Sequence, residues 1–236
     1  MEVVPMDEHQ RNAEAERAAM EQLQAQLKSI FKNLAHEVPL RLFTQPRYND
    51  VFTTACRFLV RAVREVTSKV TLREYDLHHP MAKQMNVNRA PTLVFDPNRY
   101  KIRWLGAPLG EEARTFVEAV LMMGNRASGL SQESLKILKK MTSPREVKVF
   151  VSPSCPYCPQ QAVNALKAAV ERPDLISLEL IDIQANPDLA DQYSAQSVPQ
   201  TYANEILVAQ GAQPEELFLL SLDRMEQQTI FIPDSD

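Results

Sequence analysis

The sequence predicts an α/β protein built from two tandem copies of one unit. Short β-branched, apolar stretches alternate with segments rich in helix-forming residues over most of its 236 residues, a pattern typical of sheets flanked by helices. Landmark residues also recur at nearly one spacing. Phe43 and Phe150 are 107 residues apart, and Pro91 and Pro199 are 108 apart. Such a constant offset indicates an internal repeat.

The first copy is expected over residues 37–125, after an N-terminal helix within 1–36. Residues 39–44 alternate between apolar and polar side chains, which favours a strand, and Asp50 is expected to cap the helix that follows. The whole copy has the order β-α-β-α-β-β-α. Its strands are predicted at 39–44, 69–77, 92–95 and 100–105, with helices at 51–66 and 111–123 and a short helical stretch ending near 86.

The second copy is expected over residues 147–229, after a connecting helix within 126–146. The pattern then restarts with the apolar run Val147–Val151. Strands are predicted at 147–151, 176–183, 197–203 and 206–209, with helices at 156–171, 187–193 and about 214–227. Residues 230–236 are expected to be a tail or the beginning of a linker.

Composition excludes several classes of function. The formal net charge of −4 gives no general attraction to nucleic acid or to an anionic membrane, and no apolar run approaches the roughly 20 residues of a membrane span. The N-terminus lacks the pattern of a secretory signal. Three cysteines do not make a disulfide framework, so a reducing, cytoplasmic setting is expected.

The chemistry is expected at Cys155-Pro156-Tyr157-Cys158, which follows a buried strand and begins a helix. A Cys-x-x-Cys pair at such a turn is typical of a redox-active dithiol. The free N–H groups of a helix N-terminus favour an anion, here the Cys155 thiolate. Cys155 can then attack a disulfide, and Cys158, three residues on, can resolve the mixed disulfide.

Two other interpretations of the cysteines are open. The pair could be buried and structural, although its turn context favours redox chemistry. A zinc site needs two more ligands, and Cys56 and the four scattered histidines offer no second pair, so no metal is expected. Cys56 is expected to be a buried, inert thiol within a helix, and Trp104 to pack in the core or between the copies.

A second part of the site is expected at Val198-Pro199. A bond before proline can be held cis, and a proline just before a strand leaves the preceding backbone free to pair with an extended substrate. An ordinary strand-opening proline fits these residues equally well.

Together these residues resemble the thioredoxin/glutaredoxin superfamily. Two tandem copies with the dithiol only in the second resemble the two-unit protein disulfide oxidoreductases and the N-terminal domain of the alkyl hydroperoxide reductase flavoprotein subunit. The resemblance covers roughly residues 20–227, with Gly106–Glu112 as a specific match. It implies two thioredoxin-like folds sharing one continuous mixed sheet flanked by helices.

The resemblance also implies roles for individual residues. Cys155 is the expected nucleophile and Cys158 the resolving thiol, while Pro156, Tyr157, Val198 and a cis Pro199 are expected to bind substrate. Glu112 matches a family glutamate near the dithiol, where a carboxylate can accept a proton. A solvated acid in the first turn of a helix is the alternative for Glu112.

The expected function is that of an enzyme, a dithiol–disulfide oxidoreductase. Electrons would pass from a thioredoxin-reductase-like flavoprotein, linked to flavin and NAD(P)H and either separate or fused after residue 236, to a peroxiredoxin or another protein disulfide. No cofactor is expected within the chain besides the redox-active disulfide. A glutathione-dependent glutaredoxin-type reductase and a partner-docking module of a longer flavoprotein are the alternatives.

Overall fold

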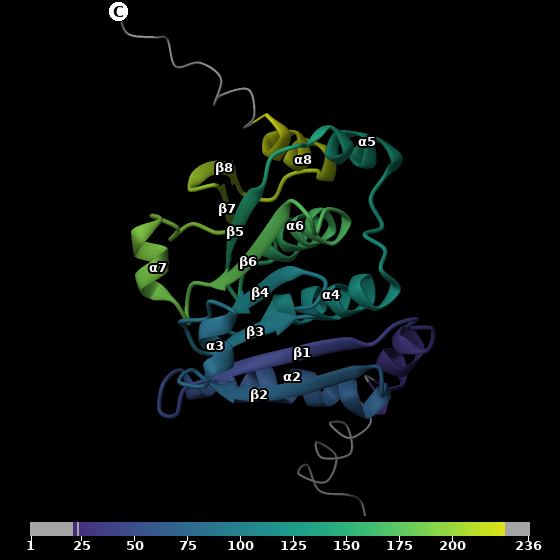
Figure 1. The fold of residues 1–236 in the computed structure, drawn as a ribbon, viewed down its shortest axis with the longest axis vertical. Coiled ribbons are helices and arrows are strands. Elements are labelled where there is room, and N and C mark those ends of the chain that lie inside the picture. Colours follow the sequence, from purple (N-terminus) through teal and green to yellow (C-terminus); the bar gives the residue numbers. More distant parts are fainter. Residues whose placement is uncertain (1–20, 23, 225–236) are drawn as a thin grey trace, which may run out of the picture.

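The computed structural model describes residues 21, 22 and 24–224 (Figure 1). Residues 24–31 are helical and precede the first strand, so the predicted N-terminal helix ends at residue 31 and does not continue to about 35. The rest of that prediction, the end of the last helix and the predicted tail at 230–236 lie outside the described residues.

The described residues form one mixed sheet of eight strands in the order β2-β1-β3-β4-β6-β5-β7-β8. The strands are short, and most are rich in β-branched or aromatic residues, which suit a half-buried or fully buried strand. The strands are β1 (Val38–Thr44), β2 (Val70–Asp76), β3 (Thr92–Phe95), β4 (Lys101–Leu105), β5 (Arg145–Val151), β6 (Ile176–Asp182), β7 (Gln200–Ala203) and β8 (Ile206–Gln210).

The strand order contains the repeat that the sequence predicts. β2-β1-β3-β4 and β6-β5-β7-β8 have the same arrangement, with one parallel pair followed by two antiparallel pairs. We call residues 38–125 unit 1 and residues 145–223 unit 2. β4 of unit 1 pairs in parallel with β6 of unit 2, with Leu105 opposite Ile181. The expected continuous sheet is therefore confirmed.

Helices cover both faces of the sheet unequally. The main core lies on one face, under α2, α4, α6 and α8, while the short α3 and α7 cover two smaller clusters on the other. The helices are α2 (Asp50–Val66), α3 (Pro80–Gln84), α4 (Ala113–Asn125), α5 (Gln132–Lys140), α6 (Cys158–Glu171), α7 (Pro187–Gln192) and α8 (Glu215–Asp223), with a 3-10 turn, η1, at Gly110–Glu112.

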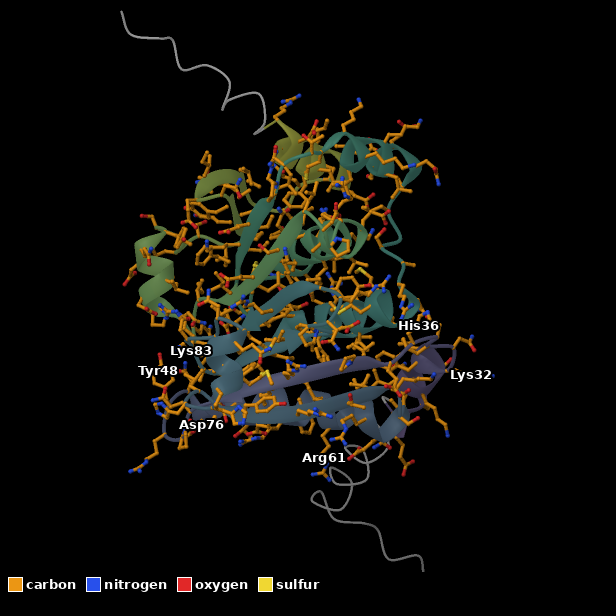
Figure 2. All side chains as sticks on the ribbon, viewed as in Figure 1. Lys32, His36, Tyr48, Arg61, Asp76 and Lys83 are labelled. Carbon is orange, nitrogen blue, oxygen red and sulfur yellow. A yellow bond between two sulfur atoms is a disulfide. The ribbon has the colours of Figure 1, made fainter. Side chains whose placement is uncertain are left out.

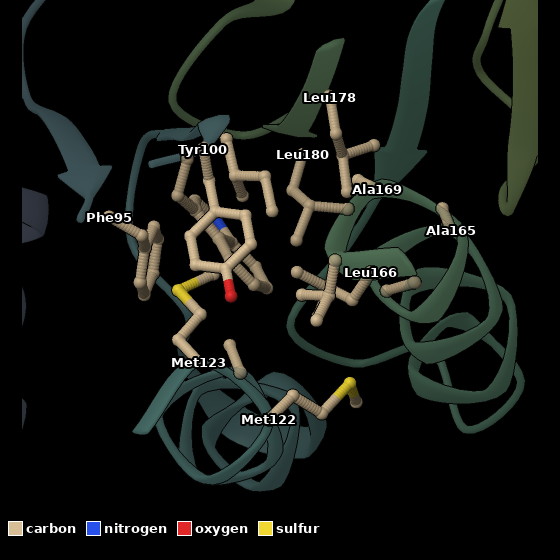
Figure 3. Close-up of a cluster of buried hydrophobic side chains, with 14 of the residues drawn as sticks. Phe95, Tyr100, Met122, Met123, Ala165, Leu166, Ala169, Leu178 and Leu180 are labelled. Carbon is tan, nitrogen blue, oxygen red and sulfur yellow. The ribbon is translucent and has the colours of Figure 1, made fainter. Parts of the chain in front are cut away.

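The main core crosses from one unit to the other. Met122 and Met123 of α4 in unit 1 belong to the same buried cluster as Leu166 of α6 and Leu180 of β6 in unit 2 (Figure 3). Trp104 of β4 is fully buried in the same cluster, as expected for a residue packed in the core. Burial of apolar area that both units share stabilises their association as well as each fold.

Three local predictions at helix starts were wrong. Asn49, not Asp50, is the N-cap of α2, and it has a left-handed φ of 54° without a side-chain cap bond. Pro156 was expected in the first turn of its helix, but α6 begins only at Cys158. The helix expected from 111 begins at Ala113, because residues 110–112 form the 3-10 turn.

No helix among the described residues is long and apolar enough to cross a membrane.

Candidate active site

Cys155 and Cys158 form a disulfide at the carboxyl end of β5, with their Cα atoms 5.4 Å apart. The apolar run of β5 ends at Val151, and a turn over residues 152–157 joins it to α6. Cys155 is half-buried, whereas Cys158, the first residue of α6, is fully buried. Only one sulfur of the pair is therefore open to an incoming disulfide.

The first turn of α6 contacts the outer sulfur. The backbone N–H of Cys158 donates to Cys155 Sγ at 3.1 Å. Such an N–H, unpaired within its own helix, is the kind of group that stabilises an anion at a helix start. The same contact would stabilise a Cys155 thiolate in the reduced protein.

The structure brings the predicted proline loop to the dithiol. The Val198–Pro199 bond is cis, and the Val198 carbonyl oxygen lies 3.7 Å from Cys155 Sγ. Pro199 is buried and leads directly into β7. Buried Gln161 of α6 donates to the Thr201 hydroxyl at 2.9 Å, which ties β7 to the dithiol helix.

Pro156 and Tyr157 lie on the surface between the two cysteines. Pro156 is exposed, and the Tyr157 side chain is 67% exposed, which is unusual for a large aromatic residue. An exposed aromatic ring next to a reactive sulfur is a suitable contact for a partner protein.

Glu112 is buried, not solvated, so the alternative of a solvated helix-start acid is wrong. Its side chain is 1% exposed, and neither carboxylate oxygen has a hydrogen-bond partner among the described residues. Burial raises the pKa of Glu112 from 4.5 to about 7, and the nearby Thr115 hydroxyl offsets this only in part. Glu112 is therefore a candidate for proton exchange near neutral pH.

The segment that carries Glu112 lies against the dithiol loop. Glu111 N–H donates to the Pro153 carbonyl at 3.0 Å, two residues before Cys155, and η1 packs against α6. Gly110 has a φ of +56°, and a Cβ there would lie 2.3 Å from the same carbonyl oxygen. Only glycine lets unit 1 approach the loop so closely.

Asp182 is a second buried acid at this edge of the sheet, and sequence reasoning missed it. It ends β6 opposite Val151, the last residue of β5 before the dithiol loop. Burial raises its pKa from 3.8 to about 6. The available signal was an aspartate at the end of a parallel strand, where side chains of neighbouring strands meet.

Cys56 is buried as expected, and its thiol contacts the Gly106 carbonyl at 3.3 Å. Burial, with a smaller contribution from the charge of Asp182, raises the pKa of Cys56 from 9.0 to about 12. It is therefore a poor nucleophile. Within 21, 22 and 24–224, no three His, Cys, Asp or Glu side chains gather as metal ligands would.

Comparisons with known proteins identify the fold of unit 2 and the family. A thioredoxin-domain family model matches residues 145–223. A probable thioredoxin of Methanothermobacter thermautotrophicus is 38% identical over 81 residues, which cover 34% of this chain and 95% of that protein. The chain belongs to the thioredoxin family. With a Cys155–Cys158 disulfide at its site, this member of the thioredoxin family is a thiol–disulfide oxidoreductase.

The two-unit arrangement also has relatives. The alkyl hydroperoxide reductase AhpF of Pseudomonas aeruginosa is 30% identical over 167 residues, which cover 70% of this chain but only 30% of that protein. The solved structure of a protein disulfide oxidoreductase from Aeropyrum pernix is similar over 90% of this chain and 95% of that chain. Its TM-score is 0.77 at 25% identity. The tandem thioredoxin-like fold is therefore confirmed.

Proposed function

We propose that Cys155 and Cys158 pass electrons between a flavin-linked reductase and the disulfides of other proteins. The observation that carries the proposal is the asymmetry of the pair: Cys155 is half-exposed in the loop before α6, and Cys158, the first residue of α6, is fully buried. This is the arrangement that a nucleophile and its resolving thiol require. The similarity to alkyl hydroperoxide reductase AhpF supports a flavoprotein as the electron source.

The exchange runs in two balanced steps. In the reduced protein the Cys155 thiolate attacks one sulfur of a substrate disulfide, that S–S bond breaks, and the released substrate thiolate takes up a proton. Cys158, as a thiolate, then attacks Cys155 Sγ, releases the second substrate thiol and re-forms the Cys155–Cys158 bond. The second substrate sulfur leaves as a thiolate and takes up a proton, so two electrons have passed to the substrate. A dithiol of the reductase then reduces the Cys155–Cys158 disulfide by the same exchange and supplies two new electrons.

Glu112 is the proposed acceptor of the Cys158 proton. Its carboxylate is buried, carries a pKa of about 7 and belongs to the segment that packs against α6, of which Cys158 is the first residue. An acid of that pKa is close to half-ionised at neutral pH, which suits proton transfer in both directions.

A peroxiredoxin or another disulfide protein is the proposed acceptor of the electrons. Tyr157 and the Val198 backbone would contact its extended segment, since both lie beside Cys155 and neither is fully buried. The reductase would be a thioredoxin-reductase-like flavoprotein, separate or fused after residue 236. The matched region spans about a third of the length of AhpF, so this wider context belongs to the proposal.

The test is reduction of insulin disulfides by the reduced protein. Cys155→Ser should abolish turnover, because it removes the attacking thiolate, and Cys158→Ser should accumulate mixed disulfides that mass spectrometry detects. Cys56→Ala is the matched control, a cysteine outside the pair whose loss should leave turnover intact. Full turnover by the Cys155→Ser protein would contradict the proposal.

The insulin assay also tests the alternative that the protein is a glutathione-dependent reductase. Glutathione as the only reductant should support little turnover. In the loop before α8 the Gln213 carbonyl already accepts from Gln160 and Asn164, and the Gln213 N–H donates to Gln161. A glutathione peptide that bound to this loop would have to displace those backbone hydrogen bonds.

A further inference from the structure

Unit 1 retains the geometry of a thioredoxin-type site without its cysteines. The repeat places Tyr48 and Asn49 where unit 2 has Cys155 and Pro156, in the loop between a strand and its helix. It places Ala90 where unit 2 has Val198, and the bond from Ala90 to Pro91 is also cis. Figure 2 shows Tyr48 at the edge of the molecule, and Tyr48 is 45% exposed.

The Asn49 amide occupies this site. Its Nδ2 donates to the Ala90 carbonyl at 3.1 Å, the counterpart of the Val198 carbonyl that lies beside Cys155 Sγ in unit 2. The same nitrogen donates to the Ala185 carbonyl of unit 2 at 3.0 Å. A single amide therefore closes the site of unit 1 and joins it to the other unit.

Arg89, next to Ala90, makes a second contact with the same part of unit 2. Its Nη1 and Nη2 bind the two carboxylate oxygens of Asp188 at 2.9 and 2.7 Å. This two-bond geometry is the most favourable one for an arginine–carboxylate pair. Asn49 and Arg89 together hold residues 185–188, which we call the clamped segment.

The clamped segment leads into the substrate side of the dithiol site. It runs into α7, and the chain then returns through residues 193–197 to Val198 and Pro199. Leu189 of α7 and Val198 pack in one hydrophobic cluster with buried Phe150 of β5. A displacement of the clamped segment would therefore be transmitted through this packing to Val198.

We propose that the dithiol-free site of unit 1 is a clamp, in which Asn49 and Arg89 hold the 185–188 segment and so position the Val198 backbone opposite Cys155 for protein substrates. Asn49 and Arg89 are positioning residues, since neither touches the sulfurs. This inference rests on the proposed function of the Cys155–Cys158 pair. It also implies that the site of unit 1 binds its own chain, not an external peptide.

The sharpest test is Asn49→Asp. Aspartate has nearly the same size and tolerates the left-handed backbone, but it replaces a donor by an acceptor facing two carbonyl oxygens. The KM for insulin should rise by about threefold or more, as expected for a lost net hydrogen bond. The kcat for insulin and the rate with a small aromatic disulfide, which needs no backbone pairing, should stay unchanged. Asn86→Asp is the control, an exposed left-handed asparagine at φ 51°.

A charge exchange provides an independent test. Arg89→Asp or Asp188→Arg should each raise the KM for insulin by about twofold, less than Asn49→Asp because the Asp188 side chain is 61% exposed and screened by solvent. The double variant, with both charges exchanged, should restore the wild-type KM. A purely structural role would not produce this recovery together with an unchanged kcat.

The outcomes distinguish the clamp from the function on which it rests. If Cys155→Ser is inactive but all clamp variants have the wild-type KM for insulin, the clamp is wrong and the oxidoreductase stands. If Cys155→Ser is active, the dithiol function itself is wrong. Should Asn49→Asp fail to fold by circular dichroism, the charge exchange decides, and a double variant no better than the single ones refutes the clamp.

Discussion

At the scale of single residues, buried acids distinguish this site from an exposed pair of thiols. Glu112 and Asp182 are each 1% exposed, and burial raises both pKa values. A carboxyl group removed from water without a full set of hydrogen bonds destabilises the fold once it ionises. Both acids lie at the edge of the sheet that carries the dithiol, and a pKa shifted by burial at such a position marks a candidate functional group.

Replacement of Glu112 by glutamine should remove the destabilisation caused by the ionised, buried carboxylate. The difference in the free energy of unfolding between the two proteins should therefore depend on pH. Because the folded pKa is about 7 and the unfolded value 4.5, the native state binds more protons between these values, and its stability falls as pH rises through that window. Glutamine does not ionise. The stability of Glu112→Gln relative to wild type should therefore rise by up to ~3 kcal/mol from pH 4.5 to pH 7 and stay level above.

Urea unfolding at pH 5 and pH 8 measures this difference. Glu111→Gln is the matched control, because Glu111 is the exposed neighbour in the same turn. A stability difference between wild type and Glu112→Gln that is equal at the two pH values would show that the carboxyl group is not buried in its neutral form.

At the scale of elements, the loop from Gly106 to η1 joins unit 1 to two segments of unit 2, the end of β6 and the start of the dithiol loop. Gly106 packs against Asp182 and Ala185, where a Cβ would lie 2.7 and 2.8 Å from their Cβ atoms. Gly110 packs equally closely against Pro153, because a Cβ at Gly110 would lie 2.3 Å from the Pro153 carbonyl oxygen. Two glycines thus permit one loop to contact the end of β6 and the start of the dithiol loop.

Gly110→Ala should damage this contact. The alanine would adopt a left-handed backbone at a cost of about 1–2 kcal/mol and would also push on the Pro153 carbonyl. Gly129→Ala separates the two effects, because Gly129 has a similar φ of +67° with no atom within 4 Å of the added Cβ. Thermal unfolding should show a larger fall in Tm for Gly110→Ala, and its insulin reduction should slow. Equal Tm values and rates for the two variants would contradict the close contact.

The same scale shows what the sequence could predict. The strands and long helices were located within a few residues, because apolar alternation and the repeat offset depend on neighbours along the chain. Cys155, Cys158 and Val198 were expected to lie together because the motif itself specifies their geometry, and the structure brings them together.

The features that the sequence did not predict depend on contacts between segments that are far apart along the chain. The burial of Glu112 and Asp182 follows from the packing of η1 on α6 and from the pairing of β4 with β6, neither of which leaves a local pattern. Asn49 was overlooked because its partners, Ala90 and Ala185, are 41 and 136 residues away. Asp50 was a reasonable cap by type, but a left-handed residue at 49 changes where the helix begins.

At the scale of the whole molecule, the two units share one sheet and one core. The parallel β4–β6 pair spans five residue positions, and fully buried Trp104 of β4 lies opposite Leu180 of β6. Two thioredoxin-like units joined by a flexible linker would fold independently, but a shared core couples them.

Unfolding should therefore be a single cooperative transition. Trp104 is the only tryptophan of the sequence, so its fluorescence reports on the junction, whereas far-UV circular dichroism reports on all helices and strands. The two urea transitions should coincide in midpoint and slope. A fluorescence transition that precedes the loss of secondary structure would mean that the junction opens before the units unfold.

The β4–β6 pair has a further consequence for solubility. A strand at the margin of a sheet presents unpaired backbone groups that can recruit another chain and begin a fibril. Two separate units of this topology would present four such margins, whereas the joined sheet of the described residues leaves only β2 and β8 outermost. The joined sheet of the described residues therefore has no more exposed edge strands than a single unit of this topology would have.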